Sequence, residues 1–176
     1  TIVGDTTDPA SVTIAPGASA TYIDHFTLKT SQGTDSITNL TLTFPTGTAS
    51  STSLIEITDV TGSTVYGSVS NTATDTPTIT LTGLTANTST TTYKVRITPK
   101  SHANMPAPVL GQSYSLTARV SAITSTNANK VYGDVGGGVV SIENLSPNSV
   151  QNNGTVWSTS TSAADNNWNA VVYGKG

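Results

Sequence analysis

Apolar and polar residues alternate over short stretches along most of this chain, which is the pattern of half-buried β-strands. In the clearest stretch Tyr93, Val95 and Ile97 share one parity, while Lys94 and Arg96 share the other. Helical periodicity is almost absent. The alternating stretches span residues 11–17, 20–30, 37–47, 53–70, 76–85, 90–100, 113–124 and 136–145.

Turn-forming residues separate these stretches, for example Pro16-Gly17 and Thr61-Gly62. A glycine run at 136–138, which we expect to be flexible, begins the last stretch. The spacing predicts an all-β fold, an antiparallel β-sandwich of about eight to ten strands, rather than alternating βαβ units. Because each stretch has one apolar face, we expect each sheet to be packed on one side and solvated on the other.

The composition divides the chain of 176 residues into three parts. Residues 1–8 are predicted to be an N-terminal turn or linker, and residues 9–145 the β-sandwich domain. From residue 146 the chain becomes rich in Asn, Ser and Gly, and residues 146–176 are predicted to form a C-terminal extension with a docking strand. A plain linker would not usually carry the bulky residues found there. We therefore predict an interaction arm formed by Trp157, Trp168, Val171, Val172 and Tyr173.

Charge and composition exclude some classes of partner. The formal net charge is −3 and only 10% of the residues are charged, so a basic surface for nucleic acid is not expected. Serine and threonine make up roughly a third of the chain. A surface kept soluble by hydroxyl groups is typical of bacterial extracellular β modules, and we predict an extracellular or cell-surface location.

The absence of cysteine and of long apolar stretches excludes further kinds of chemistry and location. The chain has no cysteine, which excludes disulfides and thiolate chemistry. No stretch of about 18 apolar residues occurs, so we predict that the chain does not span a membrane.

A resemblance emerges from "VTIAPGASATYIDHFTLKTSQGTDSITNLTLTF", residues 12–44. An apolar strand, a Pro-Gly turn, a strand containing Phe-Thr-Leu and a strand of alternating Leu and Thr follow one another. This order resembles bacterial cell-surface modules with an immunoglobulin-like or fibronectin-like sandwich, of the adhesin, surface-layer or filament-subunit type. The resemblance extends in style over roughly the first 145 residues, and it implies an immunoglobulin-like sandwich without shared catalytic residues.

The stretch "YKVRITPKSHANMPAP", residues 93–108, is the first candidate for chemistry. It holds three of the seven basic residues together with His102 and Met105. A copper site would need further soft ligands, and the chain has no second methionine. We interpret the stretch as a strand that ends at Pro99, with Met105 at the edge of the core and His102 in solvent.

Acidic residues are the second candidate. Asp5 and Asp8 flank the sequence "DTTDP", and extracellular sandwiches can bind calcium through such acids, although the spacing matches no known calcium loop. The alternative interpretation is a plain turn. For Asp24, which lies among apolar residues, we expect an edge position or a salt bridge to Lys or Arg.

Catalysis is not predicted. No Gly-x-Ser-x-Gly motif accompanies the many serines, and the two glutamates, Glu56 and Glu143, are not marked as a glycosidase pair. We therefore predict no catalytic, cofactor-binding or metal-binding residues, no cofactor and no enzymatic activity.

Two functions remain. The first is a non-catalytic structural module of an extracellular surface assembly or filament, which associates through β-strand edges and the C-terminal arm. Its partners would be copies of itself or neighbouring surface-protein domains. The alternative is a carbohydrate-binding or adhesion module that recognises surface glycans through Tyr132, Trp157, Trp168 and Tyr173.

Overall fold

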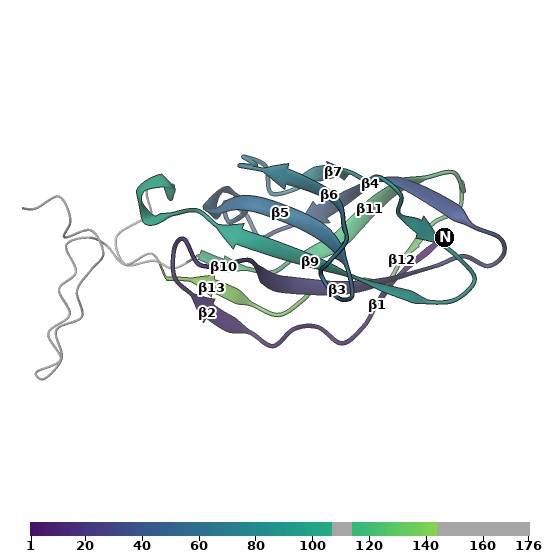
Figure 1. Ribbon diagram of the computed structural model, residues 1–176, viewed down its shortest axis with the longest axis horizontal. Helices are drawn as coiled ribbons and strands as arrows, with labels where there is room; N and C mark the ends of the chain where they lie inside the picture. The colour runs from purple at the N-terminus through teal and green to yellow at the C-terminus, as the bar shows by residue number, and fades with distance from the viewer. Residues whose placement is uncertain (107–113, 144–176) are drawn as a thin grey trace, which may run out of the picture.

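The computed structural model describes residues 1–106 and 114–143, and these residues form an all-β architecture, as the alternating pattern predicts (Figure 1). No helix among them is long and apolar enough to cross a membrane. The strands are β1 (Ile2–Asp5), β2 (Val12–Ile14), β3 (Thr21–Lys29), β4 (Asp35–Thr43), β5 (Thr52–Asp59), β6 (Val65–Ser70), β7 (Thr78–Thr80), β8 (Thr85–Ala86), β9 (Thr91–Pro99), β10 (Tyr114–Leu116), β11 (Arg119–Ser125), β12 (Val131–Tyr132) and β13 (Val140–Ile142). Two single-turn 3-10 helices, η1 (Ala49–Ser51) and η2 (His102–Asn104), complete the described elements.

The strands form several sheets arranged like a sandwich. The largest has six strands in the order β12-β1-β3-β9-β5-β6, and a second has the order β11-β4-β7, with β8 also paired to β4. Most neighbours are antiparallel, whereas β1 pairs with β12 in parallel and β13 pairs with β2 in parallel. A small sheet, β10-β13-β2, lies at one end of the molecule, and residue Thr1 lies toward the other end (Figure 1).

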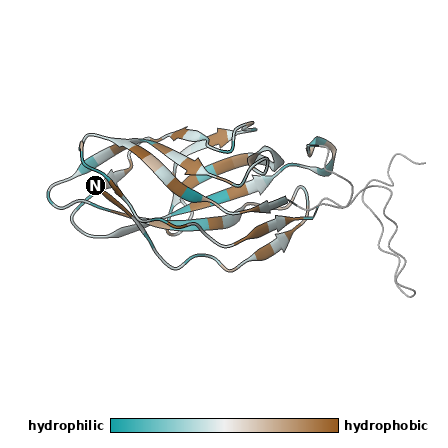
Figure 2. Ribbon diagram, turned by 180° about the vertical axis from the view of Figure 1, so that it is seen from behind, coloured by the Kyte–Doolittle hydropathy of each residue, from teal (hydrophilic) through white to brown (hydrophobic). Residues whose placement is uncertain are grey.

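The two larger sheets enclose one hydrophobic core. Figure 2 shows apolar and polar residues alternating along the long strands. Alternation places every second residue of β9 inside, and Tyr93, Val95 and Ile97 are buried, as predicted. Phe26 and Leu28 of β3 and Leu40 and Leu42 of β4 face them from the neighbouring strands and the opposite sheet. Burial of such large side chains contributes about 1.5–3 kcal/mol each to folding.

Two stretches differ in detail from the alternating pattern. In the stretch 113–124, Leu116, Ala118 and Val120 are buried, but a register shift between Val120 and Ala122 changes the buried parity, so that Ile123 is buried next. The stretch also divides into β10 and β11 of different sheets. Residues 1–8, interpreted as a turn or linker, include strand β1 next to β3. The described strands outnumber the eight to ten expected because several have only two or three residues.

Candidate functional site

Two carboxyl groups, those of Asp24 and Asp134, are buried in the interior of the fold. Asp24 has no exposed surface and Asp134 is 6% exposed. Asp24 lies on β3 with the same parity as the core residues Phe26 and Leu28, so its side chain points between the sheets. A register shift between Tyr22 and Asp24 in the β3–β9 pairing marks a bulge at this point. The expected salt bridge to Asp24 does not form among the described residues. The expected edge position holds locally, because β1 pairs with β3 only from Phe26 to Lys29 and Asp24 pairs with β9 alone.

Three oxygens of these two carboxyl groups have no hydrogen-bond partner within the described part of the chain. They are both carboxyl oxygens of Asp24 and Oδ1 of Asp134. The remaining oxygen, Oδ2 of Asp134, accepts a hydrogen bond of 2.5 Å from the backbone N–H of Val120. An unsatisfied buried polar group costs about 1–3 kcal/mol, and more when it is charged. Such a group therefore requires an explanation.

Asp5 and Asp8 lie beside this pair. Asp5 ends β1 opposite Phe26 of β3, so it lies on the inner face of the sheet at an exposed position. Oδ1 of Asp8 accepts a hydrogen bond of 3.2 Å from the backbone N–H of His25, the residue after Asp24. We call Asp5, Asp8, Asp24 and Asp134 the acidic cluster. Asp5, Asp8 and Asp24 are candidates from the sequence, and the structure adds Asp134.

Burial and the charges of neighbouring carboxyl groups disfavour ionisation of Asp24 and Asp134. Burial, together with the negative charges of Asp134 and Asp8, raises the pKa of Asp24 to about 9. Burial likewise raises the pKa of Asp134 to about 6, while the hydrogen bond from Val120 and the charge of Arg119 oppose the shift. Burial therefore favours the protonated, neutral form of Asp24 near neutral pH, unless a cation compensates the carboxylate.

The glycine run at 136–138 holds the segment that carries Asp134 against β3. A Cβ atom on Gly137 would lie 1.8 Å from the carbonyl oxygen of Ile23 and 2.7 Å from Cα of Asp24. A Cβ atom on Gly138 would lie 2.1 Å from the carbonyl oxygen of Pro9. These glycines allow a close backbone approach, so the expectation of a flexible run is wrong.

The arrangement limits which ligands the cluster could hold. No three His, Asp or Glu side chains among residues 1–106 and 114–143 converge as a ready set of metal ligands. Asp24 and Asp134 supply unpartnered carboxyl oxygens, and the backbone carbonyl groups of Ile23 and Pro9 lie close to the adjoining glycines. The chemistry that this place supplies is therefore oxygen coordination by the two carboxyl groups.

An apolar edge is the second feature that could act on a partner. Ile2, Val131, Tyr132 and Val135 are between 43% and 72% exposed, and Ile2 lies opposite Val131 where β1 pairs with β12. The hydroxyl oxygen of Tyr132 accepts a hydrogen bond of 3.1 Å from the backbone N–H of Ile123. We call these four residues the β12 edge, because β12 is the outermost strand of the large sheet.

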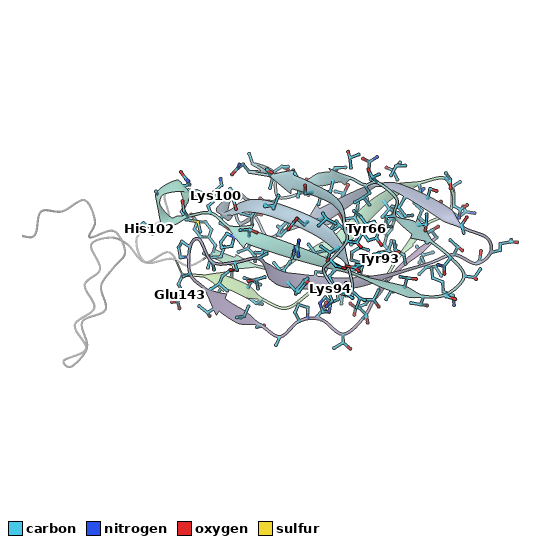
Figure 3. The ribbon with its side chains drawn as sticks, viewed as in Figure 1. Tyr66, Tyr93, Lys94, Lys100, His102 and Glu143 are labelled. Carbon is cyan, nitrogen blue, oxygen red and sulfur yellow. The ribbon has the colours of Figure 1, made fainter. Side chains whose placement is uncertain are left out.

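The stretch 93–108 does not form a site where the structure describes it. Lys94 lies over the ring of Tyr22 at 4.6 Å, and Arg96 forms a 2.7 Å ion pair with Glu56. Figure 3 shows Lys100 and His102 near one end of the molecule and Lys94 nearer its middle. Met105 packs against the core, as predicted, and the basic residues cover the outer face of β9.

The predicted interaction arm lies outside the described residues, and so do both tryptophans. The prediction for Trp157, Trp168, Val171, Val172 and Tyr173 therefore stays a prediction. Asp134 was not singled out from the sequence. The glycine run two residues after it was the available signal, because consecutive glycines can mark a close backbone approach as well as flexibility.

Comparison with known proteins gives no relative for this chain: no family model matches it, and no curated protein matches it significantly.

Proposed function

We propose that this chain is a non-catalytic structural module of an extracellular surface assembly or filament, with an immunoglobulin-like sandwich of the bacterial cell-surface type. It associates with copies of itself or with neighbouring surface-protein domains through its strand edges and the arm in residues 146–176. The observation that carries this proposal is the β12 edge, where an outermost strand bears exposed apolar residues.

An outermost strand with apolar side chains favours association by strand pairing. Val131 and Tyr132 are both exposed, although only one of two successive strand residues can face a given side. Edges of this kind are usually blunted by charge or proline, because an unprotected edge recruits other strands. Within the described residues Lys130 is the one charged residue next to β12, and its ammonium group donates to the carbonyl oxygen of Asn127.

The outer surface fits an extracellular role. Thr41 and Thr78 join their hydroxyl groups across β4 and β7 at 2.9 Å, and the hydroxyl of Thr80 donates to Oδ1 of Asn39 at 3.2 Å. These exposed pairs make a face that is hydrated through hydroxyl groups rather than charges. Thr1 and the end of β13 lie toward opposite ends of the molecule, which suits modules connected end to end (Figure 1).

The alternative of a carbohydrate-binding module needs several exposed aromatic rings. Tyr132 is the one exposed aromatic residue in the described part of the chain, and Trp157, Trp168 and Tyr173 lie outside it. Recognition of surface glycans therefore stays a prediction from the sequence.

The proposal is tested by placing a charge on the β12 edge. Val131→Lys should abolish self-association of the full chain, because an ammonium group on the edge strand opposes strand pairing. Val60→Lys is the matched control, since Val60 is also exposed, at 53%, but lies in the turn between β5 and β6. Size-exclusion chromatography with light scattering reads out the result. Equal association of both variants and the parent chain would contradict a role for the β12 edge.

A further inference from the structure

We propose that Asp24 and Asp134 bind one divalent cation, of which calcium is the best match, between β3 and the segment that follows β12. This site is separate from the β12 edge and does not depend on the proposed function. The sequence predicted no metal-binding residues and left calcium open only for Asp5 and Asp8, whereas this inference rests on the contacts of Asp24 and Asp134.

The buried carboxyl oxygens without partners are too many for one proton to satisfy. Asp24 and Asp134 leave three carboxyl oxygens unsatisfied, although neither residue is more than 6% exposed. A single proton shared between the two groups would satisfy two of these oxygens at most. A calcium ion at the same place can coordinate all three oxygens at once, because calcium takes six to eight oxygen ligands and binds carboxylates in monodentate or bidentate fashion.

Little positive charge lies beside the four acids of the acidic cluster in the described part of the chain. Asp5 and Asp8 stand at the rim, and Asp8 is fixed by its hydrogen bond from the N–H of His25. No lysine or arginine forms an ion pair with any of the four acids among the described residues. The charge of Arg119 acts on Asp134, but its side chain is exposed. Without a cation, burial favours the neutral form of Asp24, whereas a bound cation would compensate the carboxylates of Asp24 and Asp134.

The backbone packs closely beside Asp24. Gly137 and Gly138 pack against the carbonyl oxygens of Ile23 and Pro9, so the backbone that follows Asp134 lies directly against β3 beside Asp24. The structure gathers no three acidic or histidine ligands among the residues it describes, so the coordination shell would be completed by backbone carbonyl groups and water. Calcium accepts such a mixed and irregular shell, whereas magnesium demands a near-ideal octahedron.

A cation bound by Asp24 and Asp134 would connect three parts of the fold. Asp24 belongs to β3, Asp134 follows β12, and the backbone N–H of Val120 on β11 already binds Asp134. A cation here would fasten the segment 133–138 to both larger sheets. Affinity should fall in the range of extracellular calcium modules, about 10⁻⁴–10⁻³ M.

The test is calorimetric titration of the full chain with calcium chloride after chelator treatment, together with thermal unfolding. We expect one calcium ion per chain, and a melting temperature raised by roughly 5–10 °C at a hundred times the dissociation constant. Asp24→Asn and Asp134→Asn should each weaken calcium binding by at least about tenfold. Both changes keep the shape of the side chain, and the amide oxygen introduced by Asp134→Asn could still accept the hydrogen bond from Val120.

Glu143→Gln is the matched control, because it removes one negative charge from an exposed position outside the acidic cluster. Its affinity for calcium should stay within about twofold of the parent chain. Absence of saturable calcium uptake by the parent chain would overturn the proposal and leave Asp24 as a protonated acid. Unchanged binding in both Asn variants, or an equal loss in Glu143→Gln, would also overturn it. If Asp24→Asn proves unfolded by circular dichroism, the Asp134→Asn and parent titrations still decide.

Discussion

Asp134 accepts a hydrogen bond from the backbone N–H of Val120, so a side chain occupies an edge amide of β11 that a neighbouring strand would otherwise fill. Tyr132 does the same for Ile123 through its hydroxyl oxygen. Both acceptors come from the chain segment that also presents the β12 edge. The segment 131–135 therefore covers the edge of β11 while it exposes the β12 edge. Separate substitutions can test these two roles.

Removing the Tyr132 hydroxyl tests how much its hydrogen bond to the edge of β11 stabilises the fold. Tyr132→Phe leaves the N–H of Ile123 without this partner, and we predict a loss of about 1–2 kcal/mol in the free energy of unfolding. Urea unfolding followed by circular dichroism measures the change. Tyr66→Phe serves as the control, because the Tyr66 hydroxyl makes no hydrogen bond within the described residues and its ring contacts Tyr93 edge-on. A loss of equal size in the control would mean that the Tyr132 hydrogen bond contributes nothing specific.

Gly137→Ala tests the close backbone approach beside Asp24. An added methyl group would meet the backbone of Ile23 and Asp24, neither of which can turn aside as a flexible side chain can. We predict a loss of about 2–4 kcal/mol in the free energy of unfolding. Gly133→Ala is the control in the same segment, since its Cβ atom would lie 3.6 Å from the carbonyl oxygen of Val3, an ordinary contact. Similar melting temperatures for the two variants would contradict the packing described for the glycine run.

Asp35 gives the fold a dependence on acid pH. Burial alone would raise the pKa of Asp35, but hydrogen bonds from the hydroxyls of Thr1 and Thr126 and from the N–H of Asn127 outweigh it and hold this pKa well below its usual range. The pKa of an unfolded Asp is about 3.9. Because the folded pKa is the lower one, this stabilisation is fully present above about pH 4–5 and is lost as the pH falls further.

Asp35→Asn isolates that effect. At pH 7 we predict a loss of about 1–3 kcal/mol in the free energy of unfolding, since charged hydrogen bonds become neutral ones. The difference between parent and variant should shrink as the pH is lowered from about 5 to about 2. Urea midpoints measured across this range give the difference directly. A difference that does not change with pH would show that the charge of Asp35 is not what stabilises the fold.

Local pattern was enough to predict the all-β architecture and much of the core. Tyr93, Val95 and Ile97 alternate with polar residues, and the strand formed there is buried on that parity and ends at Pro99. Such information is carried within a few neighbouring residues, so it can be read along the chain. Strand β1 gave a weaker signal, because it is short and contains Gly4.

The acidic cluster could not be predicted in this way. Asp24 and Asp134 are distant in sequence and meet only because β1 pairs with both β3 and β12. No periodic pattern encodes that meeting. Gly137 illustrates the same point, since three consecutive glycines permit either flexibility or a close approach, and only the position of Ile23 decides between them.

The proposed function is tested most directly by sedimentation velocity of the full chain beside a chain that lacks residues 150–176, over the same range of concentrations. We expect the full chain to form larger species as its concentration rises, and the truncated chain to stay a folded monomer. If both chains remain monomers, or if both assemble equally, association through the arm is contradicted. An unfolded truncated chain would also contradict it, because the segment would then belong to its own sandwich.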